Sequence, residues 1–98
     1  MKLELLSVAQ SEFVDAALYY ESVTKGLGRD FILEVRHGLK LIAARPETWA
    51  GLHGDVRRIL LRRFPCALLY KIKHDRIVVY AVMHLSRNPD SWKDRLRG

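Results

Sequence analysis

The spacing of apolar residues changes once along this chain, near Val56, and that change constrains the fold more than any other feature. Before Val56, apolar residues recur three or four positions apart, which is typical of amphipathic helices. After it, they gather in runs rich in Ile, Leu, Val and Tyr, which favour strands. Because 98 residues leave room for one domain, residues 1–98 are predicted to form a single α+β domain.

A short strand and a helix are predicted first. The apolar stretch Leu3–Leu6 fits a strand. Ser7 and Gln10 have the spacing of a capping box, so a helix is expected to begin near Val8 or Ala9. The buried stripe of this helix is predicted to be Phe13, Ala17 and Tyr20.

A second helix follows after a glycine-containing turn. It is predicted from about Gly28 to Ala44, and Pro46 ends it because proline disfavours helical geometry in the preceding residue. Two amphipathic helices joined by a short turn form an α-hairpin. The apolar stripe of the second helix is Phe31, Val35, Leu39 and Ile42.

The rest of the sheet is predicted in the C-terminal half. Glu47–Asp55 is expected to be a loop, and short connections between the strands that follow imply antiparallel pairing. The last strand is apolar on both faces, so it should be central rather than at the edge of the sheet. A short C-terminal helix containing Trp92 is expected after Pro89. The three strands are Val56–Phe64, Ala67–Lys73 and Ile77–Leu85.

The net charge of +6 is unevenly distributed. Residues 1–56 contain six Lys or Arg and eight Asp or Glu, whereas residues 57–98 contain eleven and three. This asymmetry favours a polyanionic target or an acidic protein partner. The alternative is that the excess positive charge only keeps the protein soluble. One cysteine excludes an internal disulfide, and no metal-ligand, cofactor or phosphate-loop motif is present, so we expect no cofactor and no metal. Without an apolar span or signal peptide, a cytoplasmic location without membrane contact is expected.

Four arginines fall within the strand predicted after Val56. If all four lie in that strand, each face receives two, and at least one face must be open or paired with acids, because burying an unpaired charge costs several kcal/mol. An open face of this kind would bind phosphate or carboxylate groups. A solvated edge strand protected by charge is the equally weighted alternative. The four are Arg57, Arg58, Arg62 and Arg63.

The end of the last strand carries a second set of candidates. His84 could act as a general base, and Arg87 could stabilise phosphate charge, although a structural histidine is the commoner case. Trp92 lies among cations that include Arg95, so it could stack on a base or pack the last helix onto the sheet.

Several segments together resemble the RelE/ParE toxin superfamily. Their order and spacing carry the likeness, which covers nearly the whole chain, and the predicted order of elements is that superfamily's architecture. The segments are LYYESV, GLGRDF, RPETW, VRRILLRRFPCALLYKI, IVVYAVMHLSRNP and SWKDR.

The resemblance implies the toxin of a type II toxin–antitoxin pair, neutralised by a cognate antitoxin. DNA binding would then come only through the antitoxin. ParE-like members inhibit DNA gyrase, whereas RelE-like members cleave messenger RNA in the ribosome. The residues expected to contact a target or antitoxin are Arg57, Arg58, Arg62, Arg63, Tyr70, Trp92 and Arg95, with His84 and Arg87 as catalytic candidates.

Departures from the RelE pattern favour the ParE-like alternative. Where RelE has an arginine early in the strand that ends at Tyr70, this chain has Ala67. Trp92 replaces a C-terminal tyrosine, whereas Arg87 matches the second phosphate-binding arginine, and His84 could substitute as base. A ParE-like inhibitor of gyrase or another protein is therefore preferred, a RelE-like messenger RNA endonuclease is the alternative, and a plain nucleic-acid-binding module ranks last.

Overall fold

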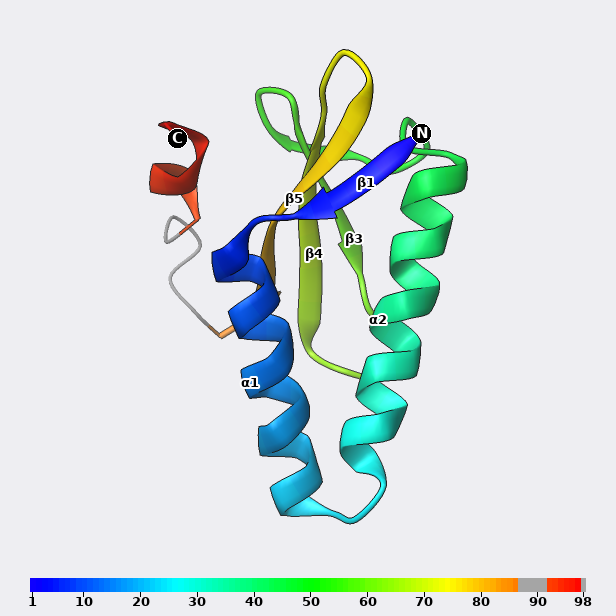
Figure 1. The fold of residues 1–98 in the computed structure, drawn as a ribbon, viewed down its shortest axis with the longest axis vertical. Helices are drawn as coiled ribbons and strands as arrows, with labels where there is room; N and C mark the ends of the chain where they lie inside the picture. The colour runs from blue at the N-terminus through cyan, green and yellow to red at the C-terminus, as the bar shows by residue number, and fades with distance from the viewer. Residues whose placement is uncertain (87–91, 98) are drawn as a thin grey trace.

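The computed structural model describes residues 1–86 and 92–97 and has the predicted α+β architecture (Figure 1). A strand and two long helices come first, four further strands complete a sheet, and a short 3-10 helix closes the chain. The elements are β1 (Lys2–Leu5), α1 (Ser7–Val23), α2 (Leu27–Ala44), β2 (Gly51–His53), β3 (Val56–Leu60), β4 (Cys66–Ile72), β5 (Arg76–His84) and η1 (Lys93–Arg97).

The strands form one five-stranded sheet in the order β1-β5-β4-β3-β2. The pairs β5–β4, β4–β3 and β3–β2 are antiparallel, as predicted, whereas β1 runs parallel to β5. β5 lies inside the sheet, which confirms the prediction from its two apolar faces. β1 covers β5 only from Arg76 to Val79, so the remainder of that edge has no strand beside it.

Two predicted boundaries are wrong. The segment Glu47–Asp55 is not all loop, because Gly51–His53 forms β2, a strand too short for its sequence to show an alternating pattern. β3 ends at Leu60, whereas the sequence predicted a strand through Phe64. A tight loop replaces its end, closed by the amide of Leu61, which donates to the carbonyl of Cys66 at 2.9 Å.

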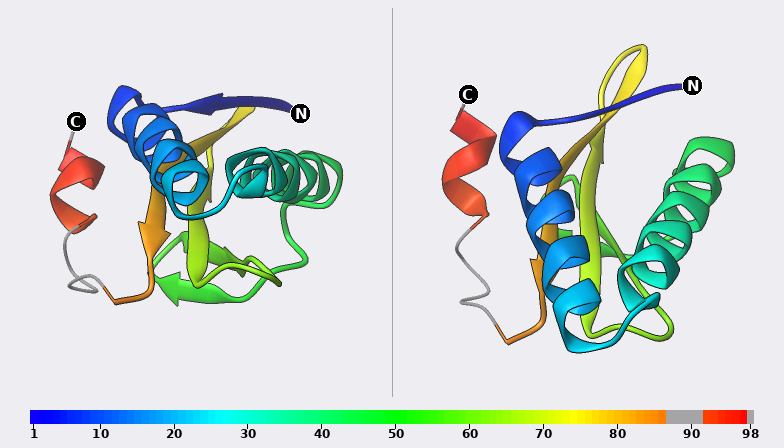
Figure 2. Two further views of the ribbon diagram at one scale, coloured as in Figure 1. Left: turned by 90° about the horizontal axis from the view of Figure 1, so that it is seen from below. Right: turned by 60° about the horizontal axis from the view of Figure 1, so that its bottom comes forward.

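Both helices lie on one face of the sheet (Figure 2). The stripe residues Phe31, Val35 and Ile42 are fully buried, and the alternate residues of β4 and β5 meet them from the sheet. The helices approach closely at their turn, where a Cβ on Gly28 would lie 2.5 Å from the carbonyl oxygen of Ala17. The amides of Gly26 and Gly28 donate to the carboxylate of Glu21, which satisfies the start of α2.

The opposite face of the sheet is partly covered by the C-terminal segment. Trp92 is 1% exposed and packs with residues of β3, β4 and β5, and Leu96 packs against the same cluster. The predicted short helix is a 3-10 helix that begins just after Trp92. The capping box predicted at Ser7 is not formed: α1 begins at Ser7 itself and has no side-chain cap.

Candidate functional site

Arg57 and Tyr70 hold the connection between α2 and β2 in place. They are neighbours across β3 and β4 and lie on the helix-side face. The guanidinium of Arg57 donates to the carbonyls of Glu47 and Trp49 at 3.0 and 2.8 Å. The hydroxyl of Tyr70 donates to the carbonyl of Pro46 at 2.6 Å, and burial raises the pKa of Tyr70. Tyr70 is fully buried, so it does not present a surface to a partner in this structure.

The other three arginines do not share a face. Arg58 is exposed and points to the side opposite the helices, since it is paired with Leu69 of the second core cluster. Arg62 and Arg63 lie in the β3–β4 loop, and Arg63 pairs with Asp30 of α2 at 3.3 Å. The prediction of four arginines in one strand is therefore wrong, because the strand ends before the last two. Their binding roles stay predictions.

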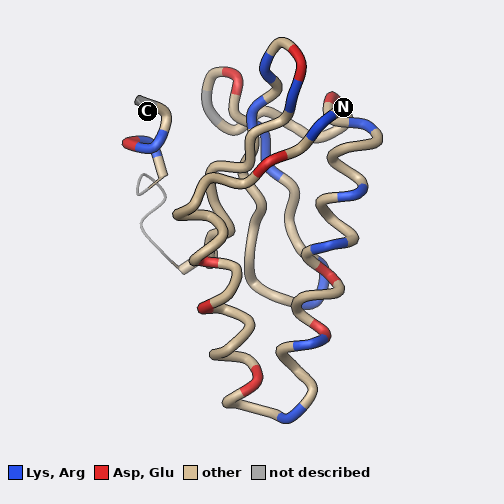
Figure 3. Tube along the Cα trace, in the orientation of Figure 1, with Lys and Arg blue, Asp and Glu red and all other residues tan. Residues whose placement is uncertain are grey.

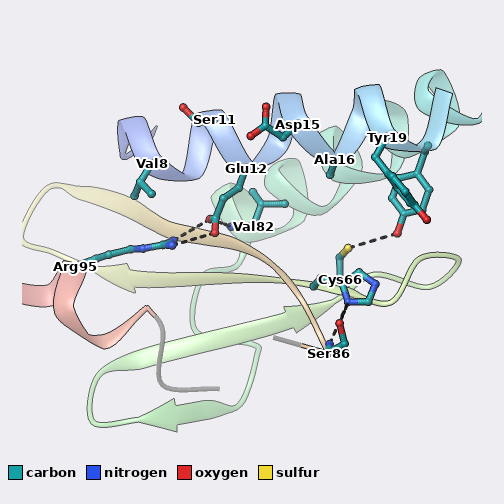
Figure 4. A pocket seen from close by; sticks show the side chains of 12 residues that line it. Val8, Ser11, Glu12, Asp15, Ala16, Tyr19, Cys66, Val82, Ser86 and Arg95 are labelled. Atoms are coloured by element: carbon teal, nitrogen blue, oxygen red, sulfur yellow. Dashed lines mark hydrogen bonds and ion pairs between the residues drawn. The ribbon is translucent and has the colours of Figure 1, made fainter. Parts of the chain in front are cut away.

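A groove of about 560 Å³ lies beside the predicted catalytic residue His84, between α1 and the C-terminal end of β5 (Figure 4). His84 lies at this groove, as does Ser86, whereas Arg87 lies outside the described residues. The lining residues are Val8, Ser11, Glu12, Asp15, Ala16, Tyr19, Tyr20, Cys66, Val82, His84, Ser86 and Arg95.

At one end of the groove, two side chains cover the edge of β5 that β1 leaves open. The carboxylate of Glu12 accepts a hydrogen bond from the amide of Val82 at 3.1 Å. The guanidinium of Arg95 donates to the carbonyl of Tyr80 at 2.9 Å and to both oxygens of Glu12, at 2.8 and 3.0 Å. The Glu12 carboxylate and the Arg95 guanidinium thus bond to the backbone groups of β5 that a neighbouring strand would otherwise pair. We call Glu12 and Arg95 the edge clamp.

The edge clamp gives Arg95 an internal partner. Its side chain is 16% exposed and that of Glu12 is 10% exposed. The predicted contact of Arg95 with a target or antitoxin stays a prediction, but this guanidinium is already engaged within the chain. Trp92 is also engaged, because it packs the C-terminal segment onto the sheet, which was one of the two predicted roles.

The geometry around His84 fixes one tautomer. The amide of Ser86 donates to Nδ1 of His84 at 3.1 Å, and the Ser86 hydroxyl lies 2.7 Å from the same nitrogen. A backbone amide can only donate, so Nδ1 carries no proton here and Nε2 carries it. In this arrangement the exposed imidazole can donate a hydrogen bond from Nε2–H, and it can act as a base only after Nδ1 is released.

Tyr20 and Cys66 form the inner wall of the groove. The Tyr20 hydroxyl lies 3.9 Å from Sγ of Cys66. Burial raises the pKa of the Cys66 thiol, and the hydrogen bond with Tyr20 only partly opposes that effect. The thiol is therefore protonated at neutral pH and is not a nucleophile.

Because of Tyr20, the folded protein is expected to lose stability at alkaline pH. Burial, then the neighbouring Cys66, raises the pKa of Tyr20 from 10.0 to about 12. The unfolded chain therefore loses this proton first, and the free energy of unfolding falls as pH rises from about 10 to about 12, by on the order of 1–2 kcal/mol. Urea unfolding across that range should show a smaller fall for Tyr20→Phe. Tyr19→Phe provides the comparison: Tyr19 is exposed and is the smallest of the causes that raise the pKa of Tyr20, so this variant should keep most of the wild-type fall.

Charge in the groove is negative rather than positive. Its described lining contains Glu12 and Asp15 against Arg95 alone, and Arg95 is neutralised by Glu12. Figure 3 shows acidic but no basic residues along α1, whereas α2 carries residues of both signs. The role of Glu12 was not predicted from the sequence, because no local pattern reveals a partner far away in the chain. In the described ranges 1–86 and 92–97, no group of three His, Cys, Asp or Glu could hold a metal, and no helix could cross a membrane.

Comparisons with known proteins inform on the fold. No family model and no curated protein matches the chain, whereas nine chains of solved structures do. One belongs to the chromosomal ParDE TA system from P. aeruginosa; it is 19% identical and superposes with a TM-score of 0.72. The match covers 88% of this chain and 97% of the other. The protein therefore has the RelE/ParE-like α+β fold that its sequence segments predicted.

Proposed function

We propose that this chain is the toxin of a type II toxin–antitoxin pair, held inactive by a cognate antitoxin in the cytoplasm. The observation that carries the proposal is the fold, which a chain of a ParDE TA system shares over nearly its whole length. The quoted sequence segments support the same conclusion independently, because they resemble toxins of the superfamily. In such a pair, DNA binding belongs to the antitoxin.

We further propose that the toxin acts on a protein, with DNA gyrase as the first candidate. Two features favour a protein over RNA. The groove beside His84 is lined by carboxylates, which would repel a phosphodiester. Ala67, at the position where RelE has an arginine, is fully buried in the cluster that contains Trp92.

Inhibition of DNA supercoiling tests the proposed target. Purified toxin is expected to inhibit gyrase, and induced expression is expected to arrest growth. If the target contacts the groove, His84→Ala should weaken inhibition about tenfold, the loss of roughly one buried polar contact. The matched control is His74→Ala, because His74 is exposed in the β4–β5 turn, away from the groove. Undiminished supercoiling at high toxin excess would rule out gyrase.

Messenger RNA cleavage in the ribosome remains the alternative. One observation favours it: the exposed His84 lies at the groove, three residues before the predicted phosphate-binding Arg87. Primer extension on RNA from cells expressing the toxin would then show cuts within translated codons. Growth arrest without such cuts would exclude this alternative and leave the protein target in place.

A further inference from the structure

The outward side of α1 is unusually apolar for a helix that faces solvent. Leu18 is 65% exposed and Val14 is 46% exposed, one turn apart on the side away from the sheet. Helices that are apolar on several sides are normally covered on several sides. α1 contains no Lys or Arg. Of its three acids, Glu12 is paired with Arg95 and Glu21 accepts from the amides of Gly26 and Gly28, so Asp15 supplies the negative charge on the outward side. Something apolar and basic would complement this surface.

The outward side of α2 has that complementary chemistry. Leu33 is 51% exposed, and Arg29, Arg36 and Lys40 are exposed along the same side of the helix. None of these three cations pairs with an acid in the described part of the chain. Beside Leu33, a hollow of about 480 Å³ is walled by the hairpin turn and the start of α2.

The complementary residues lie at similar distances from the turn. α1 and α2 are antiparallel and joined by a short turn, and Gly28 at the start of α2 lies against Ala17 and Glu21 of α1 (Figures 1 and 2). Leu18 lies five residues before the end of α1 and Leu33 six after the start of α2, and for Asp15 and Arg36 these separations are eight and nine residues. A two-fold axis that runs between the two helices and along their length would place α1 of each copy over α2 of the other. The two hairpin turns would then lie at the same level.

We propose that the helix layer is a docking surface for a second copy of this chain. In the two-fold pair, Leu18 of each copy enters the hollow beside Leu33 of the other, and Asp15 faces Arg36 of the other copy. The same patch is used on both chains, so the assembly closes as a dimer. Four helices pack as a bundle between two outer sheets. Asp15 also lines the groove beside His84, so the contact reaches one wall of that groove, whereas His84 itself, on β5, stays outside it.

The surface is small, so the dimer is weak. Two helices of this length cannot bury the area of a standard stable interface, and the pair should dissociate on dilution. Its charge complementarity is local: the excess positive charge of the chain lies after residue 56, away from the helix layer. This inference does not depend on the proposed toxin activity.

Sedimentation velocity over a range of concentrations tests the proposal. At high concentration the wild type should approach twice the monomer mass of 11.4 kDa. Leu18→Glu should yield monomers, whereas Leu60→Glu, on the opposite face and 50% exposed, should dimerise as the wild type does. Asp15→Arg and Arg36→Glu should each weaken the dimer at least about tenfold, because like charges then face one another.

The double variant Asp15→Arg/Arg36→Glu gives the decisive result. It reverses both charges, so recovery of the wild-type dissociation constant would establish the proposed register. A wild type that remains monomeric at every concentration would overturn the proposal, as would a dimer that Leu18→Glu leaves intact. A dimer without charge rescue would overturn the two-fold arrangement. Circular dichroism of each variant verifies that it is folded.

Discussion

Replacing Phe31 with alanine is expected to lower the free energy of unfolding by about 3–5 kcal/mol. Phe31 is fully buried where both helices meet the β3–β4 loop. Its ring lies 5.1 Å from those of Tyr20 and Phe64 and 6.1 Å from that of Phe13. Truncation removes the ring on which three other aromatic rings pack, and two helices and a loop would have to move to fill the cavity.

Urea unfolding followed by circular dichroism measures this effect. Leu41→Ala, in the same helix but 38% exposed, serves as control and should cost less than about 1.5 kcal/mol. A loss for Phe31→Ala no larger than that of the control would mean that the aromatic cluster is not the centre of the core. If Phe31→Ala does not fold, Phe31→Leu should show a smaller loss in the same direction.

Replacing Glu12 with alanine is expected to cost about 3–5 kcal/mol. The change leaves the largely buried guanidinium of Arg95 without its counter-ion and the amide of Val82 without its acceptor. Both losses act on the edge of β5 that no strand covers. Urea unfolding gives the total, and hydrogen exchange at the Val82 amide should show a local increase beyond the global change.

The edge clamp also predicts strong coupling between its two members. Glu12→Ala/Arg95→Ala should be less destabilised than the sum of the two single variants, because the second change removes the charge that the first left unpaired. Glu12→Gln keeps an acceptor for the Val82 amide and should lie between wild type and Glu12→Ala. Asp15→Ala, an exposed acid on the same helix, should change stability by less than about 0.5 kcal/mol in dilute solution. Additive losses would contradict the clamp.

The periodic elements of this fold were predictable from sequence. The stripe of α2 was correct at Phe31, Val35 and Ile42, which are fully buried, because helical spacing alone determines that face. β2 was missed because three residues containing a glycine show no alternation. β3 was predicted too long because Leu60–Phe64 is apolar and basic throughout, and only the hydrogen bond from Leu61 to Cys66 reveals the turn.

The site was less predictable, because it depends on contacts between distant parts of the chain. His84 was identified from its place at the end of a strand, and the structure puts it at the groove. Tyr70 was predicted to contact a partner, yet pairing with Arg57 places it beneath the helices, bonded to Pro46. No local pattern could link Glu12 with Arg95, because the ends of the chain meet only in three dimensions.

The pairing of β1 with β5 has a consequence for biosynthesis. β1 pairs with β5, more than 70 residues later in the chain, and Glu12 pairs with Arg95. Contacts between such distant positions form slowly. A nascent chain therefore exposes an incomplete sheet edge until β5 and Arg95 have been synthesised.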